Sequence, residues 1–153
     1  MELTQNPSVL ELVRKTAELT TPKEIVWIDG SEAQLKSLRK IAVETGELIK
    51  LNEEKLPGCY LNRSDVNDVA RVEGRTFICS RTREEAGPTN NWMDPDEMKA
   101  KLHEILRGAM AGRTMYVIPY AMGVIGSPFA KYGIEVTDSI YVVLNMAIMT
   151  RIG

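Results

Sequence analysis

Helix starts and short apolar segments alternate along this chain, and this alternation restricts the possible fold more than any other feature. Residues that commonly cap a helix precede three segments with helical spacing of apolar side chains: Asn6-Pro7, Ser31 with Gln34, and Asp94-Pro95 with Glu97. Strand candidates lie at 25–28, 59–61, 76–79, 114–118 and 134–137. Helices that alternate with buried strands build a sheet with helices on its faces. The sequence therefore predicts an α/β fold.

Length and charge narrow the class of protein. The 153 residues fit one domain of ordinary size, residues 1–153. The 19 basic and 21 acidic side chains give a net charge of −2, which provides no electrostatic argument for nucleic acid or anionic membrane. No apolar run reaches the length that spans a bilayer, and Cys59 and Cys79 lack the spacing of a zinc site. We therefore expect a cytoplasmic protein with neither nucleic acid nor membrane as a partner.

The segment after Asp94 and the final apolar segment allow more specific predictions. The apolar residues that follow Asp94 share one side of a helix, which predicts a buried stripe ending at Gly108: Met98, Leu102, Ile105 and Leu106. The final apolar segment, 139–150, contains no charged residue. Such a segment predicts a buried helix or strand that continues into further structure, so we expect truncation from a longer chain.

Few residues suggest chemistry when they are considered alone. The sequence has neither a GxxxxGK[ST] phosphate loop nor a GxGxxG turn. Its single histidine, His103, lies mid-helix, and the nearest carboxylate, Glu104, points to another face, which favours a surface or structural role over a metal ligand. Ser127 lies in Gly126-Ser-Pro128 without a nearby histidine in sequence, which favours a turn over a nucleophile.

The segment Asp68–Glu73 is more informative because it holds an arginine and a glutamate two residues apart. A guanidinium can bind a carboxylate or phosphate through two parallel hydrogen bonds and keeps its charge. Val72 and residues 76–79 together predict a strand, on which Arg71 and Glu73 would project to the same side. From these residues alone, a surface ion pair is the favoured interpretation.

Several motifs in order along the chain closely resemble the GTP-dependent phosphoenolpyruvate carboxykinases. They are Asp29-Gly-Ser-Glu32, 65–73, Asn91-Trp-Met93, 112–128, Thr137-Asp138 and 149–153. The chain departs from the family pattern at Tyr120 and Ala121, where phenylalanine and serine are common, and at Val124, where proline is usual. Ala147 stands where an arginine is frequent. The resemblance implies the N-terminal domain of this enzyme, with a mixed sheet flanked by helices.

The family converts oxaloacetate and GTP reversibly into phosphoenolpyruvate, carbon dioxide and GDP, with Mn²⁺ (or Mg²⁺) as the metal. The resemblance implies that Arg71 contacts the anionic substrate, oxaloacetate or phosphoenolpyruvate, and that Glu73 supports it. The family's metal ligands, phosphate loop and guanine pocket lie beyond residue 153 in a C-terminal domain. We therefore expect no catalytic, nucleotide-binding or metal-binding residue in this chain, and no catalysis by the chain alone.

Two alternatives to such a domain remain, and the first differs from it in class. One is a free-standing module that binds small anionic metabolites without converting them. The other is one subunit of a split carboxykinase that is active only with a separate C-terminal partner. The apolar final segment favours a fragment or a split enzyme over the free-standing module.

Overall fold

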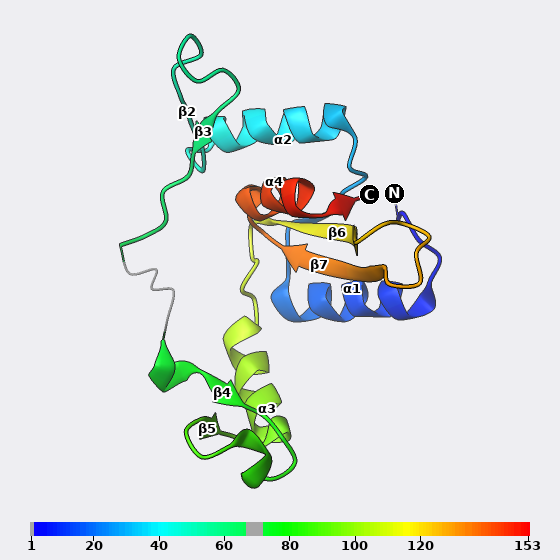
Figure 1. Ribbon diagram of the computed structural model, residues 1–153, viewed down its shortest axis with the longest axis vertical. Coiled ribbons are helices and arrows are strands. Elements are labelled where there is room, and N and C mark those ends of the chain that lie inside the picture. Colours follow the sequence, from blue (N-terminus) through cyan, green and yellow to red (C-terminus); the bar gives the residue numbers. More distant parts are fainter. Residues whose placement is uncertain (1, 67–71) are drawn as a thin grey trace.

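The main sheet is mixed, and its centre is the long strand β6 (Thr114–Met122). The computed structural model describes residues 2–66 and 72–153 (Figure 1). One edge of β6 pairs antiparallel with β7 (Lys131–Thr137). Its other edge pairs first with β1 (Glu24–Trp27) in parallel and then with β8 (Arg151–Ile152) in antiparallel orientation. The predicted α/β class, with a mixed sheet, is confirmed.

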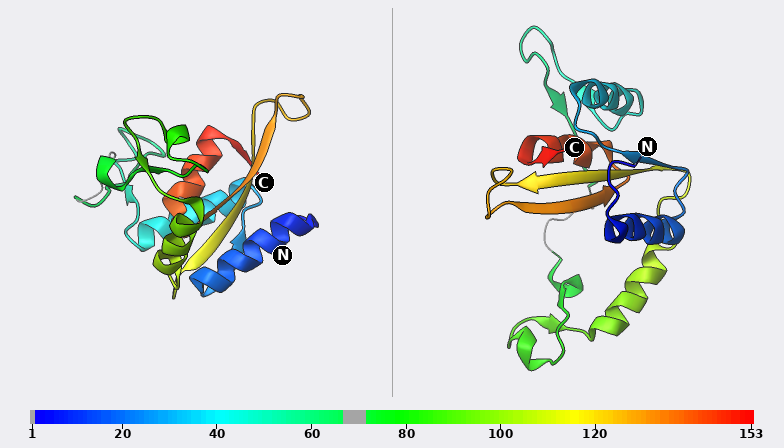
Figure 2. Two further views of the ribbon diagram at one scale, coloured as in Figure 1. Left: turned by 90° about the horizontal axis from the view of Figure 1, so that it is seen from below. Right: turned by 90° about the vertical axis from the view of Figure 1, so that its right-hand side faces the viewer.

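Helices cover both faces of this sheet. Figure 2 shows α1 (Pro7–Thr20) on one side, and α2 (Glu32–Glu44) and α4 (Ile140–Met149) on the other. The fourth helix, α3 (Pro95–Leu106), extends away from the sheet. Six shorter elements complete the described structure: β2 (Ile49–Lys50), β3 (Tyr60–Leu61), η1 (Glu73–Arg75), β4 (Phe77–Ile78), η2 (Glu84–Ala86) and β5 (Asn91–Trp92).

The core has two halves because successive side chains of β6 point to opposite faces of the sheet. Met115 and Val117 are fully buried on the face that α1 covers, where Val13 and Trp27 join them. The other face buries Tyr116 and Ile118 of β6 against apolar residues of α2 and α4: Leu35, Leu38, Ala42, Ile140 and Val143. Complete removal of these side chains from water stabilises the fold by about 1.5–3 kcal/mol for each large residue.

The three predicted helix starts are confirmed. The side chains of Asn6, Ser31 and Asp94 accept hydrogen bonds from backbone N–H groups in the first turns of α1, α2 and α3. The Gln34 side chain does not close a capping box onto Ser31. Its oxygen accepts from Asp29 N–H (2.9 Å) and its nitrogen donates to the Trp27 carbonyl (2.9 Å), which fastens α2 to the end of β1.

Strand β6 is longer than the sequence predicts. The predicted strand covers 114–118, and the next residue, Pro119, lacks the N–H of a ladder hydrogen bond. In the structure the strand continues through Pro119, which lies opposite Ile134 of β7. The Pro119 carbonyl accepts from Gly153 N–H (3.0 Å), so the chain after β8 supplies a partner on that edge.

The predicted buried stripe on α3 is wrong. Leu102, Ile105 and Leu106 are 45%, 73% and 42% exposed, and none of the residues of α3 is buried. The helix itself and its end near Gly108, which has a φ of +68°, agree with the prediction. The apolar spacing correctly indicated a helix, but α3 extends away from the sheet that would have covered this side (Figure 1).

The apolar final segment, predicted to be a helix or a strand, forms the helix α4. Ile140 and Val143 near its start are buried in the core. Ile148 and Met149 at its end are 82% and 73% exposed, so burial does not extend along the whole segment. Within the described residues, no helix combines the length and apolar character needed to cross a membrane.

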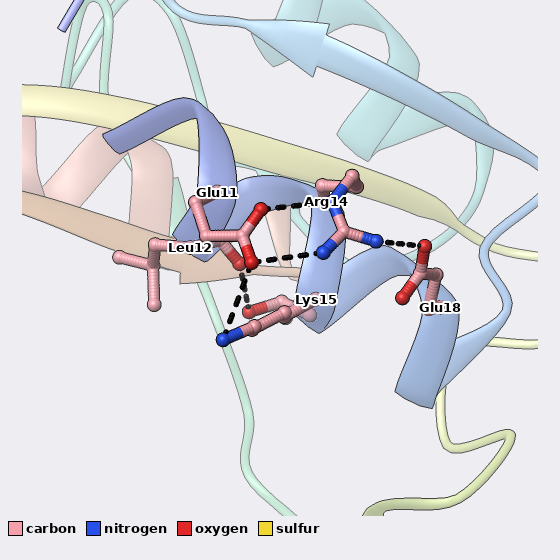
Figure 3. A network of polar contacts seen from close by, with 6 residues as sticks. Glu11, Leu12, Arg14, Lys15 and Glu18 are labelled. Atoms are coloured by element: carbon pink, nitrogen blue, oxygen red, sulfur yellow. Dashed lines mark hydrogen bonds and ion pairs between the residues drawn. The ribbon is translucent and has the colours of Figure 1, made fainter. Parts of the chain in front are cut away.

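An ion-pair network lies on the exposed side of α1 (Figure 3). The Arg14 guanidinium binds Glu11 through two hydrogen bonds (2.9 and 2.8 Å) and also contacts Glu18, while Lys15 approaches Glu11 (3.2 Å). Hydrogen bonding by Arg14 lowers the pKa of Glu11 to about 2. Because water screens all four side chains, we interpret this network as the solvated face of a helix.

The turn between β1 and α2 packs backbone against backbone with the C-terminal strand. Gly30 has a φ of +71°, and a Cβ atom at this position would lie 2.2 Å from the Ile152 carbonyl oxygen. The neighbouring Asp29 carboxylate accepts from Ser31 N–H (2.8 Å), and this hydrogen bond lowers the pKa of Asp29. Glycine is therefore required at position 30 by conformation and by space.

We predict that Gly30→Ala destabilises the chain more than Gly46→Ala, as measured by urea unfolding. Both glycines have positive φ, +71° and +80°, but a Cβ atom at position 46 would meet nothing within 4 Å. Gly46→Ala should therefore cost only the conformational penalty of about 1–2 kcal/mol. Gly30→Ala should cost about 1–3 kcal/mol more because β8 must move. Equal losses in the two variants would contradict the close packing of this turn.

Candidate functional site

The segment between β3 and α3 carries both residues that the resemblance assigns to substrate binding. Arg71 lies outside the described residues. Glu73 is described and is exposed, and it is the first residue of the short 3₁₀ helix η1. The predicted strand at Val72 is therefore wrong, whereas the strand predicted within 76–79 is present as β4.

Hydrogen bonds across a few residues form the turn that contains Glu73. Arg75 N–H donates to the Val72 carbonyl (3.0 Å), and Thr76 N–H donates to the Glu73 carbonyl (3.2 Å). The Thr76 hydroxyl also donates to the Val72 carbonyl (2.8 Å). A local turn replaces the expected extended strand because these side-chain and backbone donors satisfy its carbonyl groups.

Asn91 joins this turn to the next part of the chain. Its side-chain nitrogen donates to the Glu73 carbonyl (2.8 Å) and to the Thr76 carbonyl (3.2 Å). The backbone of Asn91 lies in β5, which pairs in parallel with β4 so that Asn91 is opposite Phe77. Sequence reasoning singled out no role for Asn91, because its two partners are 18 and 15 residues away.

Trp92 holds the other end of β4. The indole nitrogen of Trp92 donates to the Ser80 carbonyl (3.1 Å), and Met93 N–H donates to the Ile78 carbonyl (3.3 Å). Asp94 follows immediately and caps α3. The two-stranded sheet of β4 and β5, which follows η1, thus leads directly into the start of α3.

A second set of contacts fastens the upstream end of the segment to the main core. The Asn62 side chain donates to the Glu47 carbonyl (2.8 Å). The Glu47 carboxylate accepts from the Ser139 hydroxyl (2.5 Å) and from Tyr141 N–H (2.9 Å) at the start of α4. Glu47 therefore caps a helix from a distant loop, and no local spacing in the sequence could have indicated this role.

The charged loop between β4 and β5 does not extend the site. An open cavity of about 400 Å³ there is lined by Arg83, Glu84, Gly87, Pro88 and Asn90. Its lining includes one basic and one acidic residue and does not include Glu73. We therefore give this cavity no role in substrate binding.

The described residues do not form a recognisable metal centre. Among residues 2–66 and 72–153, no three His, Cys, Asp or Glu side chains are grouped so that they could hold a metal ion. His103 lies on α3 and is exposed. The side chains described here thus do not fit the divalent metal that the resemblance implies for the complete enzyme.

A family model and individual relatives both match this chain to phosphoenolpyruvate carboxykinases. A family model described as the phosphoenolpyruvate carboxykinase N-terminal domain matches residues 11–153. Proteins named phosphoenolpyruvate carboxykinase [GTP] are 56% identical in Corynebacterium kroppenstedtii and 55% identical in Anaeromyxobacter dehalogenans, each over 150 residues and 98% of this chain. The protein of that name in Neocallimastix frontalis is 53% identical over 148 residues, or 97% of this chain. The chain spans about a quarter of the length of these relatives, 24%, 25% and 24% respectively.

We predict that Glu47→Ala lowers the free energy of unfolding by about 1–3 kcal/mol, because Ser139 and Tyr141 N–H lose a charged acceptor. Urea unfolding would measure the loss. Glu44→Ala is the matched control, since Glu44 is exposed and its contact with Lys40 is 3.7 Å long. This control should change stability by no more than about 0.5 kcal/mol. Similar losses in both variants would show that Glu47 does not hold α4.

Proposed function

This chain belongs to the phosphoenolpyruvate carboxykinase N-terminal domain family, and we propose that it supplies the substrate-binding side of a GTP-dependent phosphoenolpyruvate carboxykinase. The observation that carries the proposal is the match of the family model over residues 11–153, a range that includes Arg71 and Glu73. In the proposed reaction, oxaloacetate loses carbon dioxide to form an enolate. The enolate oxygen then attacks the γ-phosphorus of GTP, and phosphoenolpyruvate and GDP are the products.

Arg71 has the chemistry that this substrate requires. Oxaloacetate and phosphoenolpyruvate both carry carboxylates, and phosphoenolpyruvate also carries a phosphate. A guanidinium donates two parallel hydrogen bonds to either group and remains charged throughout the reaction. Bound in this way, the substrate loses its freedom to rotate before the chemical steps begin. In this proposal Glu73 supports the same site as a carboxylate two residues away.

The nucleotide and metal belong to another part of the proposed enzyme. GTP and a divalent metal, Mn²⁺ or Mg²⁺, would supply the phosphoryl group and the stabilisation of developing negative charge. Since no metal-holding group occurs among the described side chains, we assign no step through the metal to this chain. The proposed partner is a C-terminal region that binds the nucleotide and metal, and the proposed location is the cytoplasm.

We predict that phosphoenolpyruvate binds this chain saturably and that Arg71→Ala weakens binding about 10- to 100-fold, as expected for the loss of hydrogen bonds between charged groups. An NMR titration with phosphoenolpyruvate would measure both dissociation constants. Arg71→Lys should remain weaker than the unmodified chain, because an ammonium keeps the charge but not the planar pair of donors.

Arg75→Ala is the matched control for this titration. Arg75 is the last residue of η1 and makes the same change in net charge when replaced. It should leave the dissociation constant within about twofold, which is a small free-energy change. Equal weakening by Arg71→Ala and Arg75→Ala would mean that net charge, rather than a specific contact, holds the ligand. Absence of binding in the unmodified chain would contradict the proposal that this chain supplies the substrate-binding side of the enzyme.

A further inference from the structure

We propose that Asn91 is a positioning residue for the substrate site. Its side chain forms a clamp, because it hydrogen-bonds to both ends of the turn that begins at Glu73. The inference rests on the proposed function, since it concerns the same segment. It assigns a role to a residue that contacts the backbone beside the site, not the substrate.

The clamp consists of one side-chain amide and two carbonyl groups. The Asn91 nitrogen donates to the carbonyl of Glu73, the first residue of η1, at 2.8 Å. It also donates to the carbonyl of Thr76, the residue after η1, at 3.2 Å. An amide nitrogen carries two hydrogens, so each carbonyl can receive one of them. The two bonds therefore span the whole three-residue helix.

The turn needs this support because it has little of its own. The hydrogen bonds of a 3₁₀ helix have poorer geometry than those of an α-helix, so a helix of three residues gains little stability from its own backbone bonds. Among the described residues 72–76, the backbone hydrogen bonds run from Arg75 to Val72 and from Thr76 to Glu73, and the Thr76 hydroxyl adds a bond to the Val72 carbonyl. None of the residues of η1 is buried, so apolar packing does not replace the missing support. The two bonds from Asn91 add support from outside the turn.

Asn91 can act as a clamp because its own backbone is fixed. It pairs with Phe77 in the parallel ladder of β4 and β5, and Trp92 beside it is anchored to Ser80. Asp94, three residues later, caps α3. A strand and the start of a helix, not a loop, therefore fix the position of η1. The direction in which the Glu73 carboxylate projects follows from that position.

Asn91→Ala tests the clamp, with Asn90→Ala as the matched control. The Asn90 side chain donates to the Ala86 carbonyl (2.7 Å) in the neighbouring loop, so the control also removes an amide donor. We expect Asn91→Ala to weaken phosphoenolpyruvate binding about five- to tenfold, and hydrogen exchange of the Arg75 and Thr76 amides to become faster by a similar factor. Asn90→Ala should change both by less than about twofold.

A second pair of variants covers the case in which Asn91→Ala does not fold. Asn91→Asp keeps the shape of the side chain but lacks the N–H donors, and Asn90→Asp introduces the same charge one residue away. The clamp predicts weaker binding and faster exchange at residues 75 and 76 in Asn91→Asp than in Asn90→Asp.

The two readouts separate the clamp from the proposed function. If the unmodified chain binds phosphoenolpyruvate and the Asn91 variants bind equally well, the clamp is overturned. If the unmodified chain does not bind phosphoenolpyruvate, the proposed function fails. Hydrogen exchange of the Arg75 and Thr76 amides then tests the clamp without the ligand. Faster exchange at residues 75 and 76 in the Asn91 variants supports it, and unchanged exchange overturns it.

Discussion

The pairing and burial of β6 set the positions of the other main elements. This strand bonds to β7 along one edge and to β1 and β8 along the other. Its Met115 and Val117 pack toward α1, while Tyr116 and Ile118 pack toward α2 and α4. Each face of β6 therefore requires a helix, and each edge requires a strand. The close contact of Gly30 with Ile152 follows from the same arrangement, because the turn after β1 must pass beside β8 on one edge of β6.

The segment that carries Glu73 is attached to this scaffold in a different way. Its upstream end depends on Asn62 and Glu47, and its downstream part depends on Asn91 and Trp92. These are polar contacts across the chain, and η1 itself contains no buried residue. Such a segment opens at a lower free energy than the core strands, as is common for the parts of a protein that bind ligands. A core sheet and the lightly held segment that we propose binds substrate are thus combined in one short chain.

Features determined by neighbouring residues could be predicted from the sequence, and features determined by distant residues could not. The caps at Asn6, Ser31 and Asp94 are local, and the structure confirms all three. The family motifs correctly indicated the family. The apolar spacing of α3 identified a helix but not its exposure, since exposure depends on where the helix extends. The extension of β6 past Pro119 depends on β7 and on the Gly153 N–H.

The site shows the same division. The sequence drew attention to Glu73 but assigned it to a strand, whereas hydrogen bonds from Thr76 and Asn91 favour a turn. The roles of Glu47 and Asn91 could not be predicted because their partners are many residues away; the motif Asn91-Trp-Met93 indicated the family but not the contacts of Asn91. The role of Arg71 remains a prediction from family resemblance.

Native-state hydrogen exchange of the unmodified chain, followed by NMR with and without saturating phosphoenolpyruvate, tests whether a stable β6 scaffold carries a less stable segment that binds substrate. We expect the amides of Val117 and Ile118 in β6 to exchange slowest and not to respond to the ligand. The amides of residues 72–80 should exchange faster and become protected when phosphoenolpyruvate is bound. Protection confined to the hairpin of β6 and β7, or exchange in 72–80 as slow as in β6, would contradict the separation of a rigid scaffold from a lightly held substrate segment.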